Sequence, residues 1–337
     1  MFKSLKISKI TIISLLIFFM GLLLIFPLHL LPCLLSGLLV FELVNAITHL
    51  LQKLIPVNKA RLISVVLLGT SIVTILSIFV FTVISLILHE IKTPDKFLQR
   101  FMLIFDKARH QLPPCIVIYL PESADEFRQI IKEWLYMHIN EIQIFGRGAI
   151  HIFFTLLAGM ILGAIIALQN IPDIKSLTPF TNALLQRSII LSNAFHNVVF
   201  AQLKISLVNT ILSAIFLLLC VPLFNVYIPL TKTLILITFI MGLIPLIGNL
   251  ISNILIFLVS LSVSIWAAVI ILSYLIAIHK LEYFLNARII GMRINSHAWE
   301  LLFAMLVFDA AFGFSGLIAA PMYYAYLKSE FKNEKLI

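Results

Sequence analysis

Apolar residues occur along this chain in long unbroken stretches, separated by short segments that carry most of its charge. The stretches cover about residues 10–28, 30–48, 62–88, 148–169, a segment that ends near 221, 233–278 and 301–327. A bilayer core about 30 Å thick needs roughly 20 apolar residues per helix, so the run 233–278 is long enough for two helices. Alternating segments of about ten residues, typical of a membrane β-barrel, are not seen. The pattern predicts an all-α polytopic membrane protein with about eight apolar membrane segments.

The longest apolar run is interrupted in its middle. Residues 233–278 contain no Asp, Glu, Lys or Arg, yet they include the sequence MGLIPLIGNLISN at 241–253. Pro245 cannot donate a backbone hydrogen bond and frees a carbonyl one turn earlier, while Gly248 loosens the backbone beside it. In hydrocarbon such groups are tolerated only against protein or a water-filled cavity. Together with Asn249 and Asn253, which share a helix face, this break is a candidate for the substrate path.

A second interruption lies in the last apolar stretch, within the sequence AAFGFSGLIAAP at 310–321. Gly313 and Gly316 are its flexible positions, and Asp309 stands four residues before the first of them. We therefore add these three residues to the candidate substrate path. Paired broken segments are the best sequence pointer to a transporter site, so we expect the two breaks to meet near the middle of the membrane.

Two acids lie inside membrane-length stretches, Glu42 and Asp309. A charge at that depth costs at least a few kcal/mol, so each is a candidate for a functional role, here the coupling of transport to an ion. Neutralisation by a buried partner is the structural alternative for both. If Asp309 is the coupling group, Asp309→Asn abolishes pH-dependent transport.

Composition and charge support the membrane assignment. Hydrophobic residues make up 61% of the chain and charged residues 12%, whereas a soluble domain is about a quarter charged. The formal net charge of +9 comes from basic residues beside apolar stretches and not from one continuous face. We expect no nucleic-acid partner.

The basic residues also predict the topology. Lys3, Lys6 and Lys9 precede the first stretch as in a signal peptide, but no small-residue cleavage site follows. The loop after the second stretch carries Lys53, Lys59 and Arg61. By the positive-inside rule, the N-terminus and this loop are both expected on the cytoplasmic side of the membrane.

One basic segment does not fit a simple count of crossings. If 233–278 forms two full spans, the segment 279–297 lies outside although it holds Lys280, Arg288 and Arg293 against Glu282 alone. The alternative is that one arm of 233–278 is re-entrant and that the last stretch dips in and returns at its own break. Arg288 and Arg293 are candidates for a basic cytoplasmic mouth or for contacts with lipid headgroups or anions.

The segment between the third and fourth apolar stretches has a different composition, with eight basic and eight acidic residues at 89–147. Helix signals begin at Thr93 and at Ser123, and each is followed by an apolar helical face. We expect three parts: 1–89 with the first three transmembrane helices, an extracytoplasmic helical insert at 90–147, and a C-terminal membrane domain at 148–337. The insert serves as a cap, a gate or a docking site.

The sequences that resemble catalytic motifs lack residues that those motifs require. The sequence GFSG at 313–316 resembles the serine motif of rhomboid proteases, but no histidine follows position 297 to accept the serine proton. Walker and dinucleotide fingerprints are absent, and Cys33, Cys115 and Cys220 are too scattered for a metal or disulfide frame. The sequence therefore predicts a protein that is not an enzyme, with no cofactor and no metal site.

The C-terminal third resembles the autoinducer-2 exporter family of bacterial membrane proteins. The resemblance rests on FIMGLIPLIGNLISN at 239–253, LEYFLNARIIGMRIN at 281–295 and FGFSGLIAAP at 312–321, in this order. Departures from the usual family pattern occur at Ala287 and Ala298, where proline is usual, at Ala46 after Asn45, and at Asp309, where small residues are usual.

The resemblance implies a permease or exporter in the bacterial cytoplasmic membrane, forming a homo-oligomer. Relatives are proposed to export the signalling molecule autoinducer-2, and others to exchange sodium for protons. Our interpretation is a secondary transporter that exports a small polar solute. A Na⁺(Li⁺)/H⁺ antiporter is the alternative, and a non-transporting scaffold that docks a partner through its insert is a third; deletion of residues 95–140 separates the scaffold from the transporters.

Overall fold

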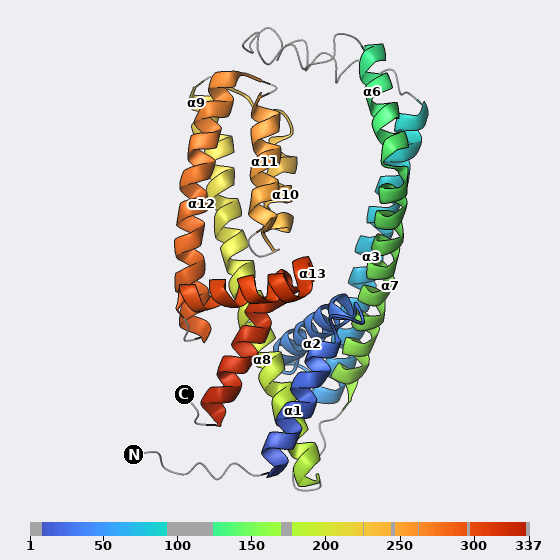
Figure 1. Cartoon of the computed structure of the whole chain (residues 1–337), viewed down its shortest axis with the longest axis vertical. Coiled ribbons are helices and arrows are strands. Elements are labelled where there is room, and N and C mark those ends of the chain that lie inside the picture. The colour runs from blue at the N-terminus through green and yellow to red at the C-terminus, as the bar shows by residue number, and fades with distance from the viewer. Residues whose placement is uncertain are drawn as a thin grey trace. The chain divides into compact units, whose positions relative to one another are not determined.

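The computed structural model describes residues 9–92, 124–169, 177–224, 226–243, 247–261, 263–294 and 297–334 (Figure 1). Nearly all of these residues are helical, and none of them forms a strand. Pro245 and the helix expected after Thr93 lie outside the described residues. The chain divides into two compact units, one built from 1–78, 145–198 and 296–337 and the other from 79–144 and 199–295.

Among the residues that the structure describes, five helices are long and apolar enough to cross a membrane, and shorter apolar helices accompany them. The prediction of an all-α polytopic membrane protein is therefore confirmed. The long helices are α2 (Leu31–Leu51), α3 (Val57–Lys92), α7 (Ile139–Leu168), α8 (Pro179–Ile215) with its continuation, and α13 (Ala298–Asn333). Helix α8 begins in the first unit and continues into the second.

The first unit joins α1 (Lys9–Leu24), α2, α7 and the first part of α8 with α13. A turn that includes Pro27 joins α1 and α2, and His29 adopts a left-handed conformation there with φ 54°. Helices α2 and α7 touch at a glycine seam. A Cβ atom on Gly159 would lie 2.1 Å from the Cys33 carbonyl oxygen, and one on Gly163 would lie 2.2 Å from the Gly37 carbonyl oxygen. The small-residue spacing in the sequence GMILG at 159–163 therefore permits close helix contact.

The second unit contains the end of α8, the π-helix η2 (Phe216–Cys220), α9 (Val221–Leu223), α10 (Thr231–Gly242), α11 (Ile247–Leu261) and α12 (Ile265–Ile294). Helix α6 (Ala124–Met137) also belongs to it and begins directly after Ser123, the expected N-cap. The apolar core of the second unit includes Leu217, Ile256 and Ile271. The ring of Phe216 stacks on Tyr274 with centroids 3.5 Å apart.

The structure gives the bounds of the helices in the charge-free run 233–278. The run contains most of α10, all of α11 and the first half of α12. The basic residues Arg187 and Lys204 lie within α8 and not in a loop before it. The helix begins at Pro179, and proline is well suited to that first helical position.

Candidate functional site

The break at 241–253 separates two short helices that fold back on each other. Helix α10 has 12 residues and α11 has 15, so they are about 18 and 22 Å long, and both fall short of a hydrocarbon core of about 30 Å. They lie side by side next to α12 and the end of α8 (Figure 1). The carboxyl end of α10 and the amino end of α11 therefore meet at the tip of this hairpin, which we call the α10–α11 hairpin.

Two glycines make the close approach at the tip possible. A Cβ atom on Gly248 would lie 1.6 Å from the carbonyl oxygen of Met241, so no larger residue fits without moving the backbone. A Cβ atom on Gly242 would lie 2.6 Å from Ser206 Oγ and 3.0 Å from Asn249 Oδ1. Polar atoms from α8 and α11 therefore reach the end of α10 on the side where Gly242 has no side chain.

Helix α8 presents a polar face to this tip. Gln202 Nε2 donates to the carbonyl oxygen of Gly242 at 2.7 Å, Ser206 Oγ donates to that of Phe239 at 2.7 Å, and Asn209 Nδ2 donates to Asn249 Oδ1 at 2.9 Å. All four polar side chains are buried. Backbone carbonyls near the break are thus hydrogen-bonded by side chains, as a non-helical segment inside hydrocarbon requires.

One acceptor at this tip is not used. Within the described part of the chain, the buried Oδ1 atom of Asn209 has no hydrogen-bond partner. A buried unpaired acceptor costs about 1–3 kcal/mol, so it is a position where a donor group of a solute or a water molecule would be stabilised. Asn249 is buried at the tip, and Asn253 is half-buried one turn further along α11.

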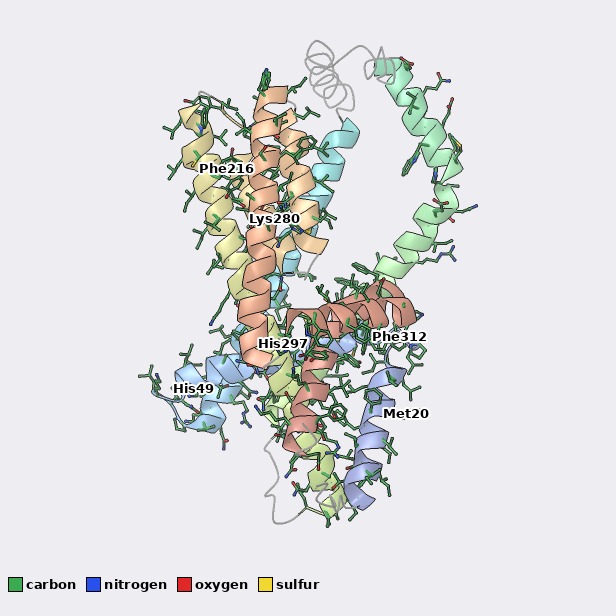
Figure 2. The ribbon with its side chains drawn as sticks, turned by 60° about the vertical axis from the view of Figure 1, so that its left-hand side comes forward. Met20, His49, Phe216, Lys280, His297 and Phe312 are labelled. Atoms are coloured by element: carbon green, nitrogen blue, oxygen red, sulfur yellow. The ribbon has the colours of Figure 1, made fainter. Side chains whose placement is uncertain are left out.

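The second break is a sharp bend in α13. Gly313 adopts φ 62° and ψ −150° inside the helix, a conformation open to glycine and strained for other residues. A Cβ atom on Gly316 would lie 2.0 Å from the carbonyl oxygen of Phe308, so the turn after the bend packs tightly on the arm before it. Phe312 lies at the bend (Figure 2). Its ring stacks on that of Phe26 from the segment after α1, with centroids 4.1 Å apart.

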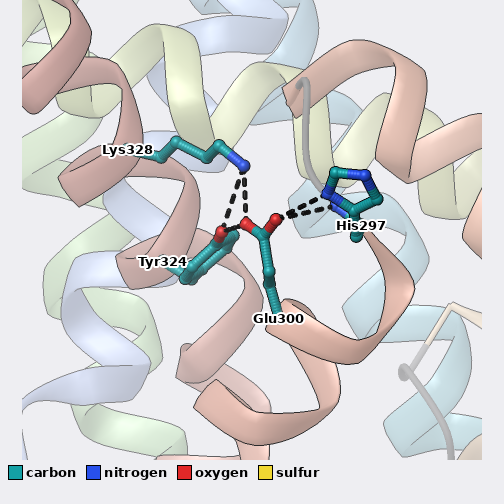
Figure 3. Close-up of polar contacts among 4 residues, drawn as sticks. All are labelled: His297, Glu300, Tyr324 and Lys328. Carbon is teal, nitrogen blue, oxygen red and sulfur yellow. Dashed lines mark hydrogen bonds and ion pairs between the residues drawn. The ribbon is translucent and has the colours of Figure 1, made fainter. Parts of the chain in front are cut away.

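The two arms of α13 are joined at their open end by a polar cluster of four residues (Figure 3). Glu300 from the first arm lies 2.6 Å from Lys328 Nζ of the second arm and also accepts a hydrogen bond from the Tyr324 hydroxyl. His297 Nδ1 lies 2.8 Å from the other carboxylate oxygen. The cluster, which we call the α13 latch, holds the arms together on the side opposite the bend.

The other candidate residues are distributed as follows. Glu42 on α2 accepts a hydrogen bond from Ser192 Oγ and lies 2.9 Å from His196 Nδ1, both on α8. Asp309 is exposed on the first arm of α13. Arg288 and Arg293 lie near the end of α12. The expectation that the two breaks meet near mid-membrane stays a prediction, since they belong to different units.

A buried ion pair was missed by sequence reasoning. Arg187 Nη1 lies 2.8 Å from Glu330 Oε1, and the side chains are only 4% and 1% exposed. Arg187 Nη2 also donates to the carbonyl oxygen of Thr11 at 2.8 Å. The pair therefore ties α1, α8 and α13 together, and breaking such a buried pair by removing one partner typically costs about 3–5 kcal/mol.

The polar face of α8 was also missed, although a signal for it exists. Gln202, Ser206, Asn209 and Ser213 are spaced by four, three and four residues, the spacing of one helical face.

Together these features define a multi-pass membrane protein with two interrupted apolar segments, one at the α10–α11 hairpin and one at the bend of α13. Residues 12–333 match the family described as AI-2E family transporter. The chain thus belongs to the AI-2E transporter family and is a membrane transporter, in agreement with the resemblance of its C-terminal motifs. No curated protein matches this chain.

Proposed function

We propose that this transporter is a secondary exporter or permease that moves a small polar solute past the tip of the α10–α11 hairpin. The observation that carries the proposal is the polar face of α8, which meets two short helices at their break. Helix ends bring partial charges to such a site, negative at the end of α10 and positive at the start of α11. Discontinuous helices that place these ends at a binding site are a recurring feature of transporters.

The packing of α10 against α11, the bend of α13 and the distribution of the basic residues support a topology with six crossings and two re-entrant hairpins. Helices α1, α2, α3, α7, α8 with its continuation, and α12 cross, while the α10–α11 hairpin enters and leaves on the outer side and α13 enters and leaves on the inner side. In this arrangement the N-terminus, the loop at 52–56 and the end of α12 all lie in the cytoplasm. Arg288 and Arg293 then satisfy the positive-inside rule.

The test is a flux screen in proteoliposomes with a panel of labelled small polar solutes, run with and without imposed proton and sodium gradients. We expect a member of the panel to move in wild-type vesicles. In Asn209→Ala the flux of that solute falls about tenfold, the equivalent of one lost hydrogen bond of about 1.4 kcal/mol. Thr210→Val is the matched control, since Thr210 Oγ1 donates only to the Ser206 carbonyl of its own helix in the described contacts.

Two results would count against the proposal. Equal loss of flux in Asn209→Ala and Thr210→Val, at equal thermal stability in detergent, would remove the hairpin tip from the path. Sodium-dependent proton flux with no movement of any solute would instead indicate a cation/proton antiporter.

A further inference from the structure

Basic side chains gather where α2 ends and α3 begins. Lys53 lies in the turn between the two helices, while Lys59 and Arg61 lie in the first turns of α3. Residues 43–89 contain no Asp or Glu, and no ion pair within the described part of the chain involves any of these three side chains. The segment 52–61, which we call the basic turn, therefore presents positive charge without a carboxylate from its own neighbourhood in the sequence.

Large apolar side chains at the same turn are directed outward. Leu50 is 66% exposed and Leu54 is 85% exposed. Helices α2 and α3 are each long and apolar enough to cross a membrane, so the turn that joins them lies at a membrane surface. At such a surface, exposed leucines contact acyl chains, while lysines place their stems along the apolar region and their charged ends among the headgroups. The apolar and basic groups together match a lipid better than a dissolved anion.

Hydrogen bonds hold the helix ends around the basic turn together. Thr48 Oγ1 in the last turn of α2 donates to Ser64 Oγ of α3 at 3.1 Å, and both side chains are buried. Arg61 Nη1 donates to the carbonyl oxygen of Gln169, directly after α7, at 3.1 Å. The ends of α2 and α7 and the start of α3 are thus joined before any ligand binds. A site that is already ordered loses less conformational freedom on binding than a flexible basic tail.

We propose that the basic turn binds an anionic phospholipid of the surrounding membrane, with the headgroup phosphate against Lys53 and Lys59 and the acyl chains beside Leu50 and Leu54. Charge complementarity selects this partner, because lysine and arginine side chains near the surface attract anionic lipids. The bound lipid spans the start of α3 and the end of α2 and stabilises their packing. The site is separate from the solute path proposed at the α10–α11 hairpin.

The test is native mass spectrometry of the full-length protein in a non-ionic detergent, titrated in turn with phosphatidylglycerol and with phosphatidylcholine of the same acyl chains. We expect the wild-type protein to bind its first molecule of phosphatidylglycerol about tenfold more tightly than its first molecule of phosphatidylcholine, since each lysine adds to the attraction for the anionic headgroup. In the double variant Lys53→Gln/Lys59→Gln this preference is expected to disappear.

The chain offers a matched control for the loss of positive charge. Lys132→Gln/Lys232→Gln also removes two exposed lysines, one from α6 and one from the first turn of α10, and is expected to keep the wild-type preference. An unchanged preference in Lys53→Gln/Lys59→Gln, or an equal loss in both double variants, would overturn the proposal. Displacement of phosphatidylglycerol by an equal concentration of inorganic phosphate would overturn it as well, because the site would then accept a dissolved anion. The titration needs no solute, so its outcome is separate from that of the flux screen.

Discussion

At the scale of single residues, Gly248 is the position where the hairpin has least room. Its missing side chain lets the backbone of α11 approach the carbonyl oxygen of Met241, and a Cβ atom at 1.6 Å cannot be accommodated. Proline and asparagine in the sequence mark the break, but the glycine makes the fold-back possible. The close approach at the tip of the hairpin thus depends on a residue that has no side chain.

We predict that Gly248→Ala lowers the stability of the protein by about 1–3 kcal/mol or more, the usual cost of forcing extra volume into a packed site. Thermal unfolding in detergent, followed by tryptophan fluorescence, measures the effect. Gly69→Ala is the control, because a Cβ atom on Gly69 meets nothing within 4 Å, and it is expected to be neutral or to stabilise α3 by up to about 1 kcal/mol. Equal stability of the two variants would contradict the close approach.

At the scale of helices, the sequence predicted the elements better than their contacts. The bounds of α2, and the ends of α7 and of the continuation of α8, agree with the apolar runs. The starts do not, because α7 begins at Ile139 and α8 at Pro179, both in more polar sequence before the apolar stretch. The breaks at 241–253 and at Gly313 follow from proline and glycine. The partners of Glu42 and Arg187 did not follow, because they come from residues about 150 positions away and depend on which helices become neighbours. Spacing along one helix carries no information on that choice.

The contacts of the α13 latch, unlike those of Glu42 and Arg187, are predictable from spacing in the sequence. Glu300 lies 13 residues before Gly313, and Tyr324 and Lys328 lie 11 and 15 residues after it. A fold-back at Gly313 places these positions opposite one another. A reversal of the chain at Gly313 is therefore sufficient to predict the contacts of the latch.

We predict that Glu300 and Lys328 are energetically coupled across the bend. A double-mutant cycle with Glu300→Gln, Lys328→Gln and the double variant, measured by thermal unfolding, is expected to show a coupling of about 0.5–3 kcal/mol, typical of residues in contact. The control cycle pairs Glu300→Gln with Lys332→Gln on the same arm, where additive effects are expected. Additivity in both cycles would mean that the latch does not hold the arms together.

At the scale of the whole chain, the two breaks and the charge distribution lead to one topology. A pair of full spans at 233–278 would place the basic residues after Ile278 outside, whereas a re-entrant α10–α11 hairpin places them in the cytoplasm. The short lengths of α10 and α11 favour the second arrangement. The proposed substrate path, the proposed cytoplasmic side of the end of α12 and the proposed re-entry of α13 all depend on this one assignment.

Cysteine accessibility at Asn286, near the end of α12, tests this assignment most directly. In intact cells or oriented vesicles, with Cys33, Cys115 and Cys220 replaced by serine, Asn286→Cys is treated with a membrane-impermeant maleimide. Tyr227→Cys, before α10, and Val263→Cys, after α11, serve as references for the outer side. The account predicts that the reagent labels both references from outside and labels Asn286→Cys only from the cytoplasmic side. Labelling of Asn286→Cys from outside, or of the two references from opposite sides, would contradict it.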